Sequence, residues 1–128
     1  MNLLLIAIGG ALGSIARYLS CEAVTKIEIF SNRFPWGVFL VNIFGSFLAG
    51  IIYFFVIKNF DNFDPRFKNF LFAGFLGGFT TFSAFSLDVF RLSQAGQYSQ
   101  AFIYALTSVV LAISALFFGF YSTKLIFS

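Results

Sequence analysis

The segment from Gly77 to Phe85, GGFTTFSAF, places glycines, threonines and phenylalanines within one of the most apolar parts of the chain. Two adjacent glycines followed by two threonines, whose hydroxyls compete for backbone carbonyls, favour a break in a helix. A break frees carbonyl groups that can bind a cation and amide groups that can bind an anion. Such groups are tolerated at membrane depth only inside protein or beside a cavity. The segment therefore predicts a helix that is broken near Gly77 to Thr81 and that can serve an ion.

Phe82 and Phe85 follow the predicted break and lie three residues apart, so their rings point to similar sides of a resumed helix. A phenyl ring has a negative face and a positive edge. Ring edges turned into a narrow path can therefore coordinate a small anion weakly. The alternative is ordinary core packing, because a chain with 22 Phe residues places such pairs by chance.

Other polar residues also fall within apolar runs. Asn42 lies near the start of one run, with Ser46 on the same helical face. A second polar stripe, within an arc of about 120° of one helix, consists of Tyr104, Thr107, Ser108 and Ser114. Each such side chain costs free energy unless it faces a partner or a water-filled path. The stripes are either hydrogen bonds between helices, worth about 0.6 kcal/mol per pair, or the polar wall of a path.

Four apolar runs must position these residues: Leu3 to Ala23, Trp36 to Ile57, Phe70 to Phe90 and Ala101 to Tyr121. The chain is 59% hydrophobic and only 10% charged, against about 25% charged residues in soluble domains. A helix needs roughly 20 apolar residues to cross about 30 Å of hydrocarbon. We therefore predict an all-α integral membrane protein, with residues 1–128 forming a single domain of four transmembrane helices.

Several function classes are disfavoured by composition. The chain has no histidine, five scattered carboxylates and one cysteine, Cys21, so it offers no transition-metal cluster and no intrachain disulfide. Its ionisable residues Glu22, Asp88 and Arg91 lie near span boundaries rather than in mid-span. A proton-coupled exporter of the small multidrug-resistance type shares the size and the four helices, but it would need a carboxylate within the membrane. A proton-coupled exporter of this type is the alternative to a passive path for an ion.

Positive charge is balanced between the two sides of the predicted membrane domain. One side carries Lys58, Arg66, Lys68 and Lys124, and the other carries Arg17, Lys26, Arg33 and Arg91. Because Lys and Arg favour the cytoplasm, this balance predicts insertion in both orientations. Two opposed copies can then pair about a two-fold axis in the membrane plane. The alternative is one orientation that a partner fixes.

Small residues recur four apart, a spacing that allows helices to approach closely. The pairs are Gly9 and Gly13, Gly10 and Ser14, Ser46 and Gly50, and Gly74 and Gly78. They predict tight packing within or between subunits.

Three ordered motifs carry a family resemblance along nearly the whole chain: GGALGSIARY, PWGVFLVNIFGSFLAG and GGFTTFSAF. The last resembles the third-helix signature Gly-Gly-x-Thr-Thr-Phe-Ser-x-Phe of the small fluoride channels called Fluc or CrcB. Phe79 and Ala84 occupy the variable places of that signature. The resemblance implies an antiparallel, dual-topology homodimer with two separate pores, each lined by both chains, and a structural Na⁺ at the dimer centre.

The resemblance also implies residue roles. Asn42 would donate its NH₂ to a dehydrated fluoride, and the ring edges of Phe82 and Phe85 would approach the ion. The main-chain carbonyls of Gly77 and Thr80, one pair from each subunit, would hold the Na⁺. The fourth-helix part of the fluoride pore would be lined by Tyr104, Thr107 and Ser108.

Arg17 matches the arginine after the first glycine motif, and we expect a vestibule or structural role for it. The implied function is passive, electrogenic export of cytoplasmic fluoride through a multi-pass protein of the cell inner or plasma membrane. The expected partners are fluoride, a second copy of the chain and the lipid bilayer, with no nucleic acid. The protein is expected not to be an enzyme.

Overall fold

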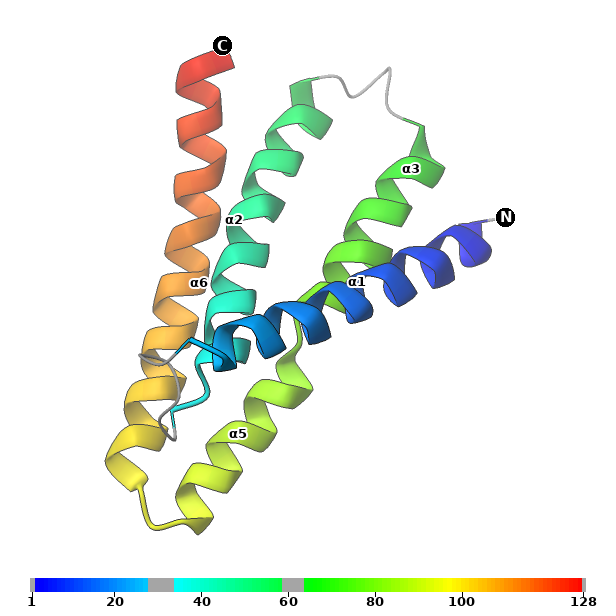
Figure 1. Cartoon of the computed structure of the whole chain (residues 1–128). Helices are drawn as coiled ribbons and strands as arrows, with labels where there is room; N and C mark the ends of the chain where they lie inside the picture. The colour runs from blue at the N-terminus through cyan, green and yellow to red at the C-terminus, as the bar shows by residue number, and fades with distance from the viewer. Residues whose placement is uncertain (1, 28–33, 59–63, 128) are drawn as a thin grey trace.

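The computed structural model describes residues 2–27, 34–58 and 64–127, and its regular elements in these ranges are helices (Figure 1). Arg33, one of the charges counted above, lies outside the described residues. The elements are α1 (Asn2–Thr25), α2 (Trp36–Lys58), α3 (Pro65–Asn69), the π-helix η3 (Phe70–Leu76), α4 (Gly77–Phe79), α5 (Phe82–Gln94) and α6 (Tyr98–Phe127).

Four helical segments in the described part of the chain are long and apolar enough to cross a membrane. They are Leu3–Thr25, Trp36–Lys58, Pro65–Gln94 and Tyr98–Phe127. The third consists of α3, η3, α4 and α5 in succession. The prediction of an all-α multi-pass membrane protein with four spans is confirmed.

The helices extend beyond the predicted apolar runs, most clearly in the third and fourth spans. The third span begins at Pro65 rather than Phe70, because Asp64 caps it: the Arg66 backbone N–H donates to Asp64 Oδ1 at 2.9 Å. Hydrogen bonds from the Arg66 backbone and side chain also lower the pKa of the Asp64 carboxyl. Hydropathy marks only the part of a helix that lipid surrounds, whereas a helix continues until its end is capped.

Glycines bring α1 against the third span. A Cβ atom on Gly9 would lie 2.7 Å from Phe70 O, and one on Gly78 would lie 2.5 Å from Gly10 O. Real Cβ atoms do not approach so closely, so these contacts between backbones require glycine. The prediction of close helix contacts is confirmed for the glycine pairs of α1 and the third span.

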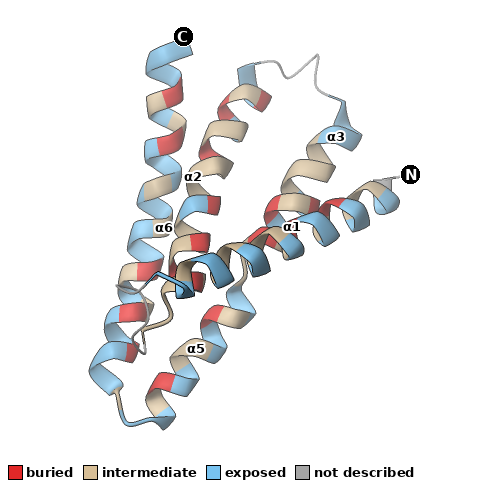
Figure 2. Cartoon of the chain, in the orientation of Figure 1, coloured by how far each residue is buried: buried red, intermediate tan, exposed pale blue. Residues whose placement is uncertain are grey.

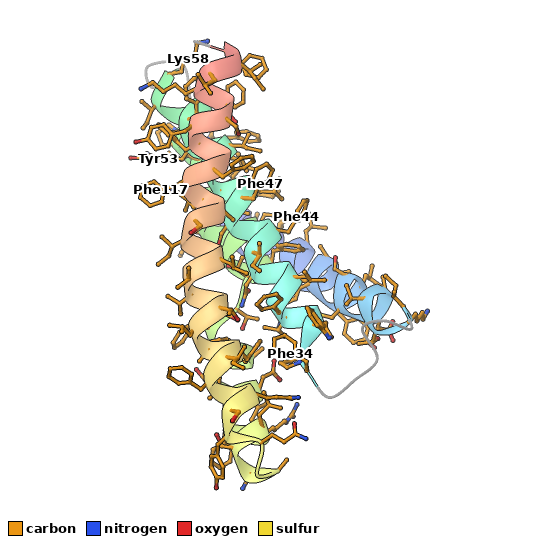
Figure 3. The ribbon with its side chains drawn as sticks, turned by 90° about the vertical axis from the view of Figure 1, so that its left-hand side faces the viewer. Phe34, Phe44, Phe47, Tyr53, Lys58 and Phe117 are labelled. Carbon is orange, nitrogen blue, oxygen red and sulfur yellow. The ribbon has the colours of Figure 1, made fainter. Side chains whose placement is uncertain are left out.

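α2 and α6 run side by side along much of the molecule (Figure 1). A Cβ atom on Gly50 of α2 would lie 2.9 Å from Phe120 N of α6. Aromatic side chains line this pair of helices, among them Phe47 and Tyr53 of α2 and Phe117 of α6 (Figure 3). The rings of Phe47 and Phe118 stack with centroids 5.9 Å apart. Lys58 joins the ends of the two helices by donating to Phe127 O at 2.6 Å.

Burial is confined to the faces where helices meet (Figure 2). A buried cluster sits between α2, α5 and α6 and consists of Phe39, Phe85, Leu92, Ala101 and Tyr104. The outer faces of α1 and α6 instead expose many large apolar side chains, among them Leu4, Ile15, Phe102 and Ile113. Such a surface matches lipid rather than water as the surrounding medium.

Candidate functional site

The third span is interrupted at Thr80 and Thr81. Both residues have extended backbone angles, φ −90° and ψ 151° for Thr80 and φ −149° and ψ 127° for Thr81. Gly77, in contrast, is helical, with φ −63° and ψ −35°. The predicted break is therefore present, but the threonines make it. Gly78 instead allows close approach to α1, and the Thr81 hydroxyl caps α5 by accepting from the Ala84 N–H at 3.2 Å.

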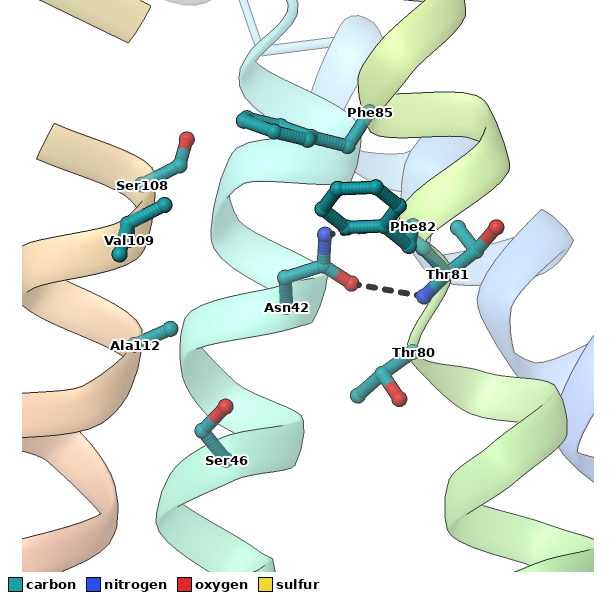
Figure 4. A pocket seen from close by; sticks show the side chains of 9 residues that line it. All are labelled: Asn42, Ser46, Thr80, Thr81, Phe82, Phe85, Ser108, Val109 and Ala112. Carbon is teal, nitrogen blue, oxygen red and sulfur yellow. Dashed lines mark hydrogen bonds between the residues drawn. The ribbon is translucent and has the colours of Figure 1, made fainter. Parts of the chain in front are cut away.

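The Asn42 side chain of α2 forms two hydrogen bonds with the backbone of Thr81 at the break (Figure 4). The Thr81 N–H donates to Asn42 Oδ1 at 2.9 Å, and Asn42 Nδ2 donates to Thr81 O at 3.1 Å. This pair of bonds fixes which end of the amide carries the NH₂ group. An amide NH₂ has two protons, so Asn42 retains a second N–H for another acceptor.

Among the carbonyls at the edge of the break are those of Gly77 and Thr80. In a continuous helix the Thr81 N–H would donate to Gly77 O and the Ala84 N–H would donate to Thr80 O. Here these donors go to Asn42 Oδ1 and to Thr81 Oγ1. Both carbonyl oxygens therefore lose their helical partners.

A pocket of about 220 Å³ adjoins the break between α2, α5 and α6 (Figure 4). It is lined by uncharged residues: Asn42, Ser46, Thr80, Thr81, Phe82, Phe85, Ser108, Val109 and Ala112. The structure thus brings Asn42, the two phenylalanines and Ser108 to one place from three separate spans.

Phe82 and Phe85 both line the pocket, as their spacing predicts, but they are held differently. Their ring centroids lie 5.5 Å apart at an interplanar angle of 43°. Phe85 is 9% exposed and packs on Tyr104, with centroids 5.1 Å apart, whereas Phe82 is 76% exposed. The Phe85 ring is therefore fixed by the chain itself, and the Phe82 ring is not.

Ser108 is the polar member of the pocket contributed by α6. Ser108 is 6% exposed, and its buried Oγ has no hydrogen-bond partner among the residues that the structure describes. A buried hydroxyl without a partner is rare because it loses its hydrogen bonds to water. Ser108 therefore keeps a donor available beside the pocket.

Tyr104 and Thr107, which were expected beside Ser108, lie outside the pocket lining. Tyr104 is fully buried, and its hydroxyl donates to Asp88 Oδ2 at 3.2 Å. The Thr107 hydroxyl donates to Ile103 O of its own helix at 2.5 Å. Arg17 also lies outside the lining, and within the described ranges its buried Nε has no hydrogen-bond partner.

Two further pocket residues are Ser46, which the sequence places in the polar stripe of Asn42, and Ala112, which was not singled out from the sequence. Ser46 follows Asn42 by four residues and Ala112 follows Ser108 by four, so both share a helical face with a predicted residue. That periodicity was the available signal for them. Thr80 was predicted only through its carbonyl, although its side chain also reaches the pocket.

The family model described as "CrcB-like protein, Camphor Resistance (CrcB)" matches residues 4–120. The chain belongs to the CrcB family. The resemblance seen in the three sequence motifs is thereby confirmed.

Several curated CrcB relatives match nearly the full chain. A protein of Hahella chejuensis is 39% identical over 98% of this chain and 96% of its own length. A protein of Agrobacterium fabrum is 43% identical over 93% of both chains, and one of Leptospira interrogans is 43% identical over 96% of this chain and 94% of its own. Each is named "Fluoride-specific ion channel FluC". The prediction that the chain is not an enzyme is confirmed, since its relatives are named as ion channels.

Proposed function

We propose that the chain is a fluoride channel that exports cytoplasmic fluoride passively and electrogenically across the cell inner membrane. The observation that carries the proposal is the uncharged polar pocket where Asn42 is hydrogen-bonded to Thr81 at the break of the third span. The names of the CrcB relatives support fluoride as the ion.

The pocket has the chemistry that a small anion requires. Burying a bare ion costs tens of kcal/mol in the ideal case, so donors must replace its water shell. The second Asn42 N–H, the unpaired Ser108 hydroxyl and the edges of the Phe82 and Phe85 rings supply partial positive charge. Conduction also needs an ion that leaves readily, and a wall without Lys or Arg does not trap it.

A second copy of the chain is proposed to close the pocket. Phe82 lines the pocket yet is 76% exposed, so the pocket lies at the surface of a single chain. A polar pocket open to lipid would be costly. A two-fold dimer would cover it and would contain one such pocket per chain. We therefore propose two pores per homodimer.

The opposed orientation of the two copies is supported by the balance of positive charge, four Lys or Arg residues on each side of the predicted topology. Labelling an engineered cysteine at the C-terminus of a variant that lacks Cys21, from each face of sealed vesicles, tests this arrangement. Labelling from both faces is expected, and labelling from one face alone would contradict dual topology.

The freed carbonyls of Gly77 and Thr80 fit the expected Na⁺. Carbonyl oxygens are suitable ligands for hard cations, and the break has removed the helical donors of both groups. Gly77 is exposed in the single chain, as a site shared between two chains requires. When bound, the cation supplies a fixed positive charge that offsets part of the dehydration cost of fluoride.

The alternative of a proton-coupled exporter would need a carboxylate in the path. Asp88 is the candidate carboxylate in the third span. It lies outside the pocket lining, and it accepts a hydrogen bond from the Tyr104 hydroxyl. The geometry therefore favours the channel.

Ser108→Ala tests the proposed pocket. Because the Ser108 hydroxyl has no partner in the described part of the chain, its removal should leave stability unchanged. Fluoride release from liposomes should fall about tenfold, as expected for losing one hydrogen bond to a charged group. Ser114→Ala is the matched control, because Ser114 shares the predicted stripe of this helix but is exposed and lies outside the pocket lining. Equal release from both variants would contradict a role for this hydroxyl in the pore.

A further inference from the structure

Gly45 lies on α2 three residues after Asn42 and is buried directly against the break. A Cβ atom at this position would overlap Thr80 Cγ2 and would lie 3.1 Å from Phe79 Cδ2. Phe79 and Thr80 therefore pack directly against the Cα atom of Gly45, which carries no side chain.

Thr80 cannot move its methyl group away without losing a hydrogen bond. Its Oγ1 donates to Leu76 O at 2.8 Å, and its backbone N–H donates to the same oxygen at 2.9 Å. Together with the stiffness of a β-branched side chain, these bonds fix the Thr80 rotamer. Rotation of the methyl would break the bond from Oγ1.

Phe79 is equally constrained. It is 5% exposed, and its ring stacks on Phe75 with centroids 6.0 Å apart. The ring also meets Phe44 of α2 at 6.3 Å in an edge arrangement. A methyl group on Gly45 must therefore push α2 and the break apart, because a well-packed neighbour does not yield locally.

We infer that Gly45 is a positioning residue for the ion site at the break. Its bare Cα sets the separation between α2 and Thr80, and thereby the placement of the freed Thr80 and Gly77 carbonyls. From the same helix α2, Asn42 holds the break by hydrogen bonds to Thr81, and Gly45 holds it by contact with Thr80. The inference rests on the proposed Na⁺ site, but it assigns the residue that holds that site in place.

Gly45→Ala tests the inference by melting of the purified protein in NaCl and in N-methylglucamine chloride. A cation that binds only the folded state raises the melting temperature by mass action. The unaltered protein should show a Na⁺-dependent rise. In Gly45→Ala the Na⁺ concentration needed for the same rise should increase by at least about tenfold, the size of an ordinary coupling between residues in contact.

Two further variants separate positioning from general packing. Gly50→Ala places a methyl 2.9 Å from Phe120 N, so it disturbs the contact of α2 with α6 rather than the break. It should lower the melting temperature in both salts and keep the Na⁺-dependent rise. Gly45→Ala combined with Thr80→Ser removes the overlapping methyl but keeps the hydroxyl and the carbonyl. Its Na⁺ requirement should return to within about threefold of that of Thr80→Ser alone.

An unchanged Na⁺ requirement in Gly45→Ala, or no recovery on adding Thr80→Ser, would overturn the inference. The absence of a Na⁺-dependent rise in the unaltered protein would overturn it as well. A lack of fluoride flux would instead contradict the proposed function and leave this test intact, because melting reads Na⁺ binding directly.

Discussion

Asn42→Asp should reduce fluoride release by a factor of about 100 or more. Two like charges about 4 Å apart repel by about 4 kcal/mol at the effective dielectric of a protein site, so a carboxylate beside the pocket opposes an anion. The change also replaces the NH₂ group that donates to Thr81 O at 3.1 Å with an oxygen, so two acceptors then face each other. The measurement is initial fluoride release from liposomes that contain equal amounts of protein.

Asn69→Asp provides the matched control for this variant. It makes the same chemical change at the end of α3, outside the pocket lining, and should conduct within about twofold of the unaltered protein, as a substitution away from the site does. Gel filtration and melting show whether Asn42→Asp still folds. A folded Asn42→Asp protein that conducts like Asn69→Asp would contradict the role of Asn42 beside the anion.

Phe82→Ile should reduce fluoride release about tenfold, the free-energy scale of one specific aromatic contact. Isoleucine retains an apolar side chain but has no ring edge to present to the anion. Because Phe82 is 76% exposed in the single chain, its replacement should cost the fold of each subunit little. Release is measured beside melting and gel filtration of the same preparation.

Phe90→Ile is the comparison, since Phe90 lies on the same helix α5, is 57% exposed and is not part of the pocket lining. It should conduct normally. Similar losses in both variants would indicate that any exposed ring on α5 supports the assembly, and the ring-edge role of Phe82 would then be wrong.

The four spans and the broken third helix follow from composition and local sequence, because lipid forces each backbone group to be satisfied within a helix or beside a cavity. The residue that breaks the helix does not follow as directly. Glycine tolerates both helical and extended backbone, so its presence marks a possible break or a close contact equally well. Gly78 stays helical and serves the close contact with α1, whereas the break falls on Thr80 and Thr81.

The two hydrogen bonds between Asn42 and Thr81 join residues of two different spans. The sequence indicates that Asn42 needs a partner but not which one, because that depends on how α2 packs against the third span. Helical periodicity likewise places Tyr104, Thr107 and Ser108 on one side of α6. It cannot tell that the first two hydroxyls donate to Asp88 and to Ile103 O, whereas that of Ser108 has no partner among the residues described.

The central claim, that the protein conducts fluoride passively through an uncharged path, is tested most directly by fluoride release from liposomes loaded with potassium fluoride. A fluoride electrode follows release with and without valinomycin, which supplies a path for K⁺ to balance charge. Vesicles loaded with chloride are measured beside them. Release of fluoride only after valinomycin is added, with chloride retained, is the predicted result. Release that needs no valinomycin and follows a pH gradient would contradict the account and favour a proton-coupled transporter.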